Sequence, residues 1–593
     1  MPRFNPIQLA AASVCGASLT AGAPQALADV TLTSSDGRWT AIIETDGGAT
    51  GQCNGMSDTS QPAAYRSFLV NTRHYVRIGT AISYGAAVSQ PMQNHFHPLS
   101  FANSNDSYTA VLASNNVPGL IAIIHGEMVA GASGGLRVCL TFADTAPSDL
   151  ILAQYSVKPF VYANLNVDGQ MLGNTGSWSS DHYTQAAPPT GTGNDRWFRG
   201  RDPVAHQSML NSSMQDSLDS GMAELANISN TGPGDINTAM SFAVGSLGPG
   251  DAHTVAYALG NENISIPAGF GLVPNAGAVS IASSDGRWSA AVNTGNAYLD
   301  HGSAGEITSM YDFSMPVDTS RFATLVTHYL AISTQLPVDG QKVKDTFERI
   351  AFFYPTDTTS MTSTVLNSKD WPGLVLIMDS RMYAGSNGGL VTCMKFADTL
   401  GRTLNIAPVV FADMDCDNQT VDTGEFLADH FIQKGPGFSP YRGFRAASYS
   451  SYQSGLSGAL QSTLDSGVVA LANTTVPGPI NISTALAPHP WPLIDDQPYV
   501  TGFALGAPNL QIPPAFVRPS VWYTCPADVA PAPDGDSMID VNDLLSVITS
   551  WGACPLGTPG DIVPTYVGNG TVDVNDLLEV IMHWGPCWSK TPE

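Results

Sequence analysis

The sequence predicts a mainly β protein with two tandem β-sandwich-like domains, followed by a small α-helical domain at the C-terminus. Three observations predict this fold: charged residues are scarce, one long block of sequence occurs twice, and the last segment carries two clear helical patterns. Charged residues make up 12% of the 593 residues, whereas apolar residues make up 43%. Packed cores are therefore expected, and long solvent-facing helices rich in Glu, Lys and Arg are disfavoured.

The duplication is visible as short motifs that recur in the same order. The offset between equivalent positions drifts between 246 and 254 residues, as loop insertions and deletions produce. Each copy is too long for a solenoid repeat but has an ordinary length for a large β-domain. The recurring blocks, given for the first and second copy, are 34–39 and 283–288, 139–144 and 393–398, and 218–221 and 464–467.

Within each copy, short apolar runs bounded by turn residues predict strands. Residues 38–43 follow an Asp-Gly turn signal, 119–124 form a buried apolar run, and 136–142 alternate between apolar and polar. Turns this frequent favour a sheet sandwich. Residues 207–226 differ, because their apolar positions recur at helical spacing, as they do in the equivalent segment 453–472. We therefore expect one helix near the end of each copy.

The N-terminus has the features of an export signal. Arg3 precedes an Ala-rich apolar stretch, and Ala26-Leu27-Ala28 is a cleavage signal, so the mature chain is expected to begin after Ala28 and to be extracellular or on the cell surface. The apolar stretch is interrupted by polar residues, and no other segment is long enough to predict a membrane span. The net charge of −26 argues against a nucleic-acid partner, which would require a basic surface.

Seven cysteines remain after the predicted cleavage, and in an exported chain we expect most of them to form disulfides. The odd number leaves one thiol that is free or paired with another chain. These cysteines are Cys53, Cys139, Cys393, Cys416, Cys525, Cys554 and Cys587.

The C-terminal segment contains two similar units, at 528–552 and 561–585. In each unit an acidic, glycine-containing loop precedes a helical pattern that ends at a glycine. One such helix cannot bury its apolar face alone, so the two helices are expected to pack on each other. The expected face is made by Val541, Leu544, Leu545, Ile548 and Trp551 in the first unit and by Val574, Leu577, Leu578, Ile581 and Trp584 in the second.

The acidic loops offer the oxygen ligands that calcium prefers. Counting back from Asp543 and Asp576 as the last loop positions places further oxygen side chains at ligand positions, although the nearest acid to the first position lies four residues early in both loops. The predicted calcium ligands are Asp528, Asp534, Asp536, Asp540 and Asp543 in the first loop and Asp561, Asn569, Asp573 and Asp576 in the second.

The tail resembles the dockerin family, in which two EF-hand-type calcium loops, each followed by a helix, form a C-terminal module. The sequence Asp-Val-Asn-Asp-Leu-Leu, present in both halves, carries the resemblance. The resemblance implies calcium-dependent folding and docking to a cohesin-like protein. Two departures stand out: Ala532 and Thr565 occupy the first ligand positions, and Val-Asn replaces the Ser-Thr pair with which family members often recognise their partner. The alternative is a metal-free helical pair held by disulfides.

These inferences divide the chain into five segments. The expected boundaries are a signal peptide at 1–28, β-domain copy 1 at 29–276, β-domain copy 2 at 277–515, a linker at 516–524 and a dockerin-like domain at 525–588.

A further candidate metal site lies at the end of copy 2. Asp413, Asp415 and Asp417 have the spacing of a calcium loop, and copy 1 has Asn164, Asn166 and Asp168-Gly169 at the matching positions. The alternative is a strand whose polar face leads into a turn.

Other polar residues are interpreted as parts of the fold. His74 and His328 are duplicated, so hydrogen-bonded structural histidines are expected, and His95 and His97 are expected to form an exposed pair. Four arginines lie beside aromatic residues and could bind an acidic ligand or pack on the rings; they are Arg196, Arg199, Arg442 and Arg445.

The sequence contains no catalytic motif that we recognise, so no catalytic residue is assigned. The first hypothesis is a secreted or surface protein whose duplicated β-domains serve for binding or display, and whose tail docks to a partner through calcium. The alternative is an extracellular polysaccharide-degrading enzyme of the glycoside hydrolase type with the same tail. A carbohydrate ligand fits both. An acidic pair in an open cleft would favour the enzyme, and a shallow aromatic face would favour binding.

Overall fold

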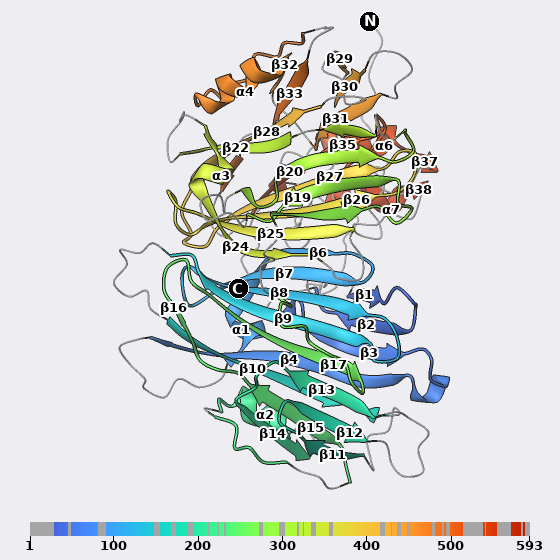
Figure 1. Ribbon diagram of the computed structural model, residues 1–593, viewed down its shortest axis with the longest axis vertical. Helices are drawn as coiled ribbons and strands as arrows, with labels where there is room; N and C mark the ends of the chain where they lie inside the picture. The colour runs from blue at the N-terminus through green and yellow to red at the C-terminus, as the bar shows by residue number, and fades with distance from the viewer. Residues whose placement is uncertain are drawn as a thin grey trace, which may run out of the picture.

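The computed structural model is mostly β, with four sheets arranged as two similar sandwich-like pairs (Figure 1). It confirms the predicted fold class. The described residues are 29–45, 49–80, 90–146, 155–167, 174–186, 195–210, 213–222, 224–229, 233–271, 277–295, 303–316, 320–323, 325–333, 340–354, 360–414, 422–427, 430–435, 441–447, 451–476, 481–488, 491–493, 498–513, 538–539, 541–553, 571–582 and 585–586. The predicted signal peptide and linker lie outside them.

Copy 1 contains an outer and an inner antiparallel sheet. The outer sheet has the order β1 (Val30–Thr33), β2 (Trp39–Ile43), β3 (Cys53–Asp58), β4 (Ser67–Thr80), β10 (Tyr155–Leu165), β15 (Ile236–Ser241), β14 (Ala205–Leu210), with β5 (Gln90–Pro91) beside β4 and β16 (Gly245–Leu247) beside β10. The inner sheet has the order β11 (Thr175–Trp178), β12 (His182–Ala186), β13 (Arg196–Gly200), β17 (Ala252–Asn261), β9 (Gly135–Asp144), β8 (Leu120–Val129), β7 (Ser107–Ser114), β6 (Phe96–Asn103).

Copy 2 repeats this strand order. Its outer sheet has the order β18 (Ala278–Ala282), β19 (Trp288–Asn293), β20 (Ile307–Asp312), β22 (Leu325–Ser333), β28 (Leu404–Asp413), β33 (Ile482–Ala487), β32 (Ser451–Leu456), with β21 (Arg321–Ala323), β23 (Gln341–Lys342) and β34 (Trp491–Leu493) beside β20, β22 and β28. Its inner sheet has the order β29 (Thr423–Phe426), β30 (His430–Lys434), β31 (Arg442–Ala446), β35 (Tyr499–Gly506), β27 (Gly389–Asp398), β26 (Leu374–Tyr383), β25 (Met361–Ser368), β24 (Phe347–Phe353).

The main core of each copy lies between its two sheets. In copy 1 it contains Trp39 of β2, Phe68 of β4 and Leu140 of β9, all buried. In copy 2 the equivalent residues are Trp288 and Phe322, with Met394 from β27. Strands β9 and β27 are buried along their whole length. One face of each strand meets the core of its own copy, and residues on the other face pack against the opposite copy.

The two inner sheets pack against each other through equivalent residues, and in Figure 1 strands β24 and β25 of copy 2 lie next to β6 and β7 of copy 1. The apolar contact contains Val111, Ile121, Ile123 and Ala143 from copy 1 and Val365, Val375, Ile377 and Ala397 from copy 2. At one end the hydroxyls of Thr145 and Thr399, themselves equivalent, lie 3.0 Å apart. Equivalent patches meeting each other is the arrangement of a two-fold symmetric interface.

Each copy has one short helix on its outer sheet, later in the sequence than predicted. Residues 207–210 of the stretch expected to be helical belong to strand β14, and α2 covers Ser213–Asp219. In copy 2, β32 likewise precedes α4 (Ser457–Asp465). Met214 and Leu218 are buried against Tyr75 and Phe160 of the outer sheet. The helical spacing therefore marked the helix correctly, but pairing with β15 forms a strand where the pattern begins.

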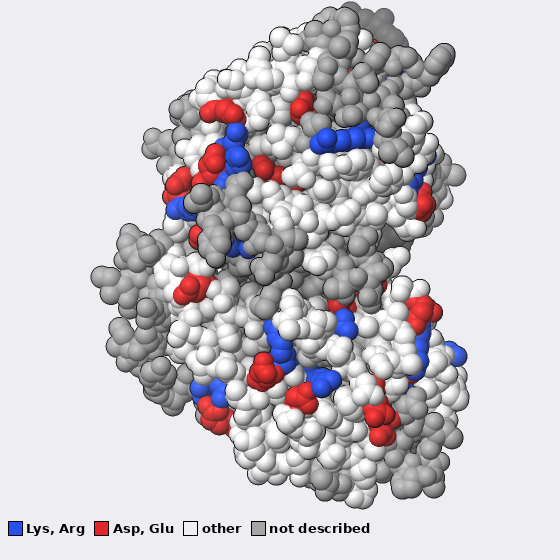
Figure 2. All heavy atoms as spheres, in the orientation of Figure 1, with Lys and Arg blue, Asp and Glu red and all other residues white. Residues whose placement is uncertain are grey.

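Two further helical turns, α1 (Met92–His95) and α3 (Val343–Thr346), lead from β5 and β23 into the inner sheets. Among the described residues, no helix is long and apolar enough to span a membrane. Figure 2 shows that most of the face in view is uncharged, and that many of its basic side chains lie next to acidic ones.

The described part of the tail consists of helices α6 (Val541–Thr549) and α7 (Val574–Met582), which contact each other. Short antiparallel pairs link β36 (Met538–Ile539) to β39 (Gly585–Pro586) and β37 (Gly552–Ala553) to β38 (Thr571–Val572). The prediction of the apolar face was wrong in detail: Val547, Val572 and Val580 are fully buried, whereas Val541, Leu545, Ile548, Trp551, Val574, Leu578 and Ile581 are about half exposed.

Candidate functional site

The duplicated Ser-Ser-Asp-Gly-Arg-Trp motif joins the two sheets of each sandwich. In copy 1, Asp36 accepts the Gly131 N–H at 2.8 Å, and the Trp39 indole N–H donates to the Gly131 carbonyl at 2.9 Å. Copy 2 has the same two bonds between Asp285, Trp288 and Gly385. A motif whose polar groups are all used within the fold needs no ligand to explain its duplication.

Two of the four candidate arginines are part of the same structural arrangement. Arg196 is 1% exposed and reaches Asp58 at 3.3 Å, and Arg38 binds the same carboxylate at 3.0 Å. The Arg196 guanidinium also lies 4.7 Å from the centre of the Phe68 ring. Burial would raise the pKa of Asp58, but bonds from Arg38 and Ser60 and the charge of Arg196 outweigh it and lower that pKa. Copy 2 repeats this pair of contacts with Asp312, Arg287 and Arg442.

The duplicated histidines occupy one position in the two cores but differ in their contacts. His74 lies 2.8 Å from the Tyr257 hydroxyl, as expected for a structural histidine. His328 faces Phe503, which has no hydroxyl, and neither of its ring nitrogens has a hydrogen-bond partner within the described residues. The expectation of a hydrogen bond is therefore confirmed for His74 and wrong for His328. Burial lowers the pKa of His74 to about 3 and that of His328 to about 4.

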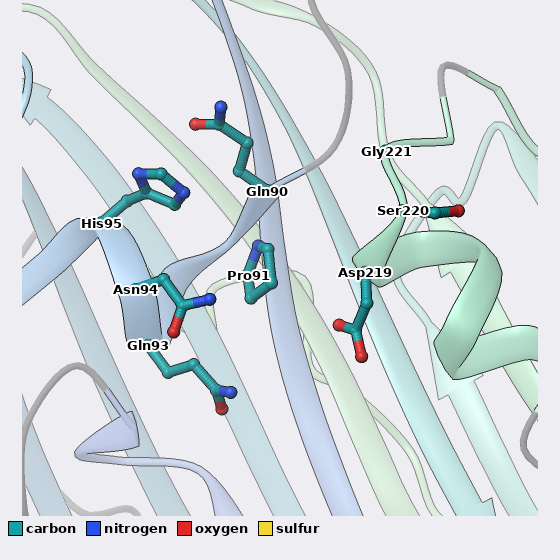
Figure 3. Close-up of a pocket in the computed structure, with 8 residues that line it drawn as sticks. All are labelled: Gln90, Pro91, Gln93, Asn94, His95, Asp219, Ser220 and Gly221. Carbon is teal, nitrogen blue, oxygen red and sulfur yellow. The ribbon is translucent and has the colours of Figure 1, made fainter.

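A polar hollow of about 430 Å³ lies in copy 1 between the β5–α1 segment and the end of α2 (Figure 3). Asp219 accepts a hydrogen bond from the buried Tyr75 hydroxyl at 2.8 Å, and His95 lies 2.7 Å from Asn116. His97 contacts Asn115 instead, so the two histidines do not form a joint site. The hollow is lined by Gln90, Pro91, Gln93, Asn94, His95, Asp219, Ser220 and Gly221.

Copy 2 has an equivalent hollow of about 430 Å³ with a more acidic lining. Asp465 accepts from the Tyr329 hydroxyl at 2.7 Å and pairs with Lys342 at 2.8 Å. Burial opposes ionisation of Asp465, but these two bonds outweigh it and lower the pKa of the carboxyl, which is held ionised. The hollow is lined by Gly340, Gln341, Lys342, Asp345, Thr346, Asp370 and Asp465.

Sequence reasoning did not identify these hollows, although part of the signal was present. The recurring Leu-Asp-Ser-Gly block contains Asp219 and Asp465, the carboxylates that Tyr75 and Tyr329 anchor. Their tyrosine partners come from β4 and β22, far away in the sequence, so the sequence alone cannot indicate these tyrosine–aspartate contacts. Polar linings that open to solvent suit a hydroxyl-rich or charged ligand more than an apolar one.

Of the three candidate calcium ligands in copy 2, the described residues include one. Asp413 ends β28 and accepts a hydrogen bond from Ser457 at the start of α4, at 2.8 Å. Asp415 and Asp417 lie outside the described residues. In copy 1, the side-chain oxygens of Asn164 and Asn166 are buried and have no partner in the described part of that copy, and the third matching position, Asp168, lies outside the described residues.

Three of the nine predicted tail ligands are described. Asp543 and Asp576 lie in the first turns of α6 and α7, and both are fully buried. Asp576 accepts the Asp573 N–H at 2.7 Å, and Asp573 accepts the Asn575 N–H at 2.7 Å. Within the described residues, no group of three or more potential ligands converges on one point. The other predicted ligands lie outside the described residues: Asp528, Asp534, Asp536, Asp540, Asp561 and Asn569.

Three cysteines of the β-domains carry free thiols: Cys53, Cys139 and Cys393. All are buried, and burial raises the pKa of each to about 12, so they behave as small apolar groups and not as nucleophiles. The remaining four cysteines of the predicted mature chain lie outside the described residues.

Comparisons with known proteins add little. No protein-family model and no curated protein matches the chain. Among solved structures, a bacterial glucoamylase complexed with acarbose is similar to 44% of this chain, with 11% sequence identity and a TM-score of 0.27. The match covers 36% of the glucoamylase chain.

Proposed function

We propose that the protein is an exported, non-catalytic binding protein whose duplicated β-domains contact a ligand, and whose tail docks through calcium to a cohesin-like protein. The observation that carries the docking proposal is the pair of fully buried carboxylates, Asp543 and Asp576, at the starts of two contacting helices. The helix N-terminus favours a negative charge at both positions, and Asp576 also accepts one backbone N–H.

In the proposal, each loop binds a calcium ion with one of these carboxylates as its last ligand. Both carboxylates occupy the last ligand position of the predicted loops, and oxygen ligands from a short acidic loop suit calcium. Asp573, three residues before Asp576, is half-buried and directly precedes α7. Carboxylate oxygens are ligands that a hard cation prefers, and in the proposal the acids of the preceding loop complete each site.

The half-exposed apolar residues on both helices support a protein partner. Leu545 and Ile548 on α6 are 50% and 47% exposed, and Leu578 and Ile581 on α7 are 46% and 50% exposed. Large apolar side chains clustered on a small module are typical of interaction surfaces. Calcium would fix the orientation of the two helices and thereby of this surface.

Calorimetric titration of the full-length protein, first treated with a chelator, tests the calcium site. We expect saturable calcium binding and, at each site, at least tenfold weaker binding in Asp543→Asn and Asp576→Asn. The matched control is Asp370→Asn, an exposed carboxylate of copy 2, which should bind calcium as the wild type does. No heat of binding in the wild type would refute the calcium site, because the buried carboxylates would then be satisfied within the protein.

A pull-down with a recombinant cohesin domain tests the docking itself. We expect retention with calcium, loss with a chelator, and loss with calcium present in Leu545→Asp and Leu578→Asp. Calcium binding without retention would leave a calcium-stabilised tail and would refute a cohesin-like partner.

The hollow of copy 2 favours the alternative, a polysaccharide-degrading enzyme, because Asp345, Asp370 and Asp465 line one open depression. Release of reducing ends from soluble polysaccharides by the wild type, abolished in Asp345→Asn or Asp370→Asn, would establish that alternative. Equal and background-level release by all three proteins would leave the binding proposal in place.

A further inference from the structure

We propose that copy 2 carries a glycan-binding platform, formed by Tyr311 and Phe313, on which a sugar ring of a neutral polysaccharide stacks. The proposal deepens the binding role proposed for the β-domains, and it is independent of calcium and of the tail. The platform lies at the end of β20 and in the turn that follows it.

The two rings stand parallel, in an offset stack, on a rigid support. Their planes differ by 6° and their centroids lie 5.7 Å apart, and Phe313 is 57% exposed. The Phe313 N–H donates to the Arg287 carbonyl at 2.7 Å. The residue between the two aromatics in the sequence, Asp312, is fully buried and is bound by Arg287, Arg442 and Ser314. A ring held by such a turn loses little conformational freedom when a ligand binds.

A hydrogen-bond donor without a partner lies beside the rings. Arg321 pairs with Tyr311 across β21 and β20. Its Nε is buried and has no acceptor in the described part of the chain, which is costly unless a ligand or water accepts from it. On the other side, the cross-strand neighbour of Tyr311 is Ser289, which is buried and bonded to Ser280. Arg321 is therefore the polar group that the structure places beside the rings.

Copy 1 shows that the fold does not require this platform. Ser57 and Thr59 occupy the places of Tyr311 and Phe313: Ser57 pairs with Thr40 as Tyr311 pairs with Ser289. The Thr59 N–H donates to the Arg38 carbonyl at 2.8 Å, the same backbone bond that Phe313 makes. Ser67 stands at the position of Arg321. Three hydroxyl residues in copy 1 thus correspond to two aromatics and an arginine in copy 2.

The chemistry of this patch favours a neutral glycan. A pyranose ring offers apolar C–H groups on its face and hydroxyls around its edge, which complement two flat rings with donors at the margin. The net charge of −26 repels polyanions. A stable protein partner would need about 800 Å² of surface on each side, far more than two rings supply.

Affinity gel electrophoresis of the full-length protein in the presence of a chelator tests the proposal. The probes are hydroxyethylcellulose, xylan, galactomannan and soluble starch, with polygalacturonate as the acidic comparison. We expect retardation by at least one neutral polymer and at least tenfold weaker binding in Phe313→Ala and Tyr311→Ala. Arg321→Gln should weaken binding less, because it removes donors and leaves the rings in place.

The copies provide matched controls. Ser57→Ala and Thr59→Ala in copy 1 should leave the retardation unchanged, and the double variant Ser57→Tyr/Thr59→Phe should strengthen it by giving the chain a second platform. Retardation by polygalacturonate alone, by no polymer, or equally in wild type and Phe313→Ala would overturn the proposal. Because a chelator is present, none of these outcomes depends on whether the tail binds calcium.

Discussion

Copy 1 and copy 2 bury a histidine at the same point of the same fold, yet only one of the two is hydrogen-bonded. His74 has the Tyr257 hydroxyl 2.8 Å away, whereas His328 has the Phe503 ring in the same place. The ring-to-ring distances, 5.8 Å and 5.6 Å, show that the two pairs are otherwise alike. The backbone and the apolar core have thus been kept while individual polar contacts have changed.

The interface between the copies shows the same division. Its apolar centre uses equivalent residues from both sides, but its polar residues differ. Asp379 of copy 2 is bound by Lys395, whereas the equivalent positions in copy 1 carry His125 and Thr141, and His125 stacks on Phe353 at 4.7 Å. Polar asymmetry on a symmetric apolar contact favours pairing of unlike copies over pairing of like ones.

The largest predicted effect concerns this asymmetric charge pair. Lys395 and Asp379 are 4% and 1% exposed, and Lys395 also donates to Ser100 of copy 1. Lys395→Met should lower the free energy of unfolding by about 3–5 kcal/mol, because it leaves a buried carboxylate without its cation. The shift of the urea midpoint of the full-length protein measures the effect.

A second substitution separates charge from packing. In Lys395→Met/Asp379→Asn the buried charge is gone and the bond from Ser363 to position 379 can be kept, so most of the lost stability should return. The position equivalent to Lys395 in copy 1 is Thr141. Thr141→Val should lower the free energy of unfolding by only about 1 kcal/mol, the value of one neutral hydrogen bond. Equal destabilisation of the single and double variants would mean that lost packing, and not the charge, is responsible.

The buried histidines predict smaller effects of opposite sign in the two copies. Tyr257→Phe should destabilise by about 1–3 kcal/mol, since it leaves His74 buried without a partner. Phe503→Tyr should stabilise by about 1 kcal/mol, because it gives His328 the hydroxyl that His74 already has. Thermal unfolding of both variants beside the wild type measures the difference. If Phe503→Tyr destabilised the protein, the core of copy 2 would have no room for the added hydroxyl.

The pH dependence of a His328 variant provides an independent check. Burial lowers the pKa of His328 to about 4, below the value of about 6.5 in the unfolded chain. The unfolded state therefore takes up a proton first, and the contribution of His328 is complete above pH 6.5 and lost as the pH falls towards 4. His328→Phe should flatten the decline of stability over this window. An unchanged slope would mean that other groups control it.

The sequence predicted the β class and the duplication because these depend on local turn signals and on motifs that are directly visible. The Asp-Gly turn of the motif at 34–39 and the strand after it were found for this reason. The contact between the inner sheets could not be predicted, because Val111 and Ile123 are apolar in any buried strand and only the fold shows that they meet copy 2. A missing partner, such as that of His328, is visible only once the neighbouring strand is placed.

The site predictions were limited by the same distinction. Asp543 and Asp576 could be placed at the starts of two helices because a loop and the helix after it are local in sequence, and both are buried there; their role as calcium ligands stays a prediction. The apolar face of these helices was misassigned, since the spacing does not say which side of a two-helix unit is covered. Tyr311 and Phe313 were missed altogether, because an exposed aromatic pair looks like core in a strand pattern.

A last predicted effect, also small, should be equal in both copies and tests their shared framework. Gly37 and Gly286 sit in the tight turns of the duplicated motif with the same positive φ of 69°, and an added Cβ at either meets no atom within 4 Å. Gly→Ala should therefore cost only the left-handed backbone strain, about 1–2 kcal/mol. Gly→Asn should cost less, because asparagine tolerates this conformation. Urea midpoints of the four single variants would measure both. If Gly37→Ala and Gly286→Ala lowered the free energy of unfolding by amounts that differ by more than the experimental error, the two turns would not be equivalent. The more sensitive glycine would then lie against a group that the open space around it does not show.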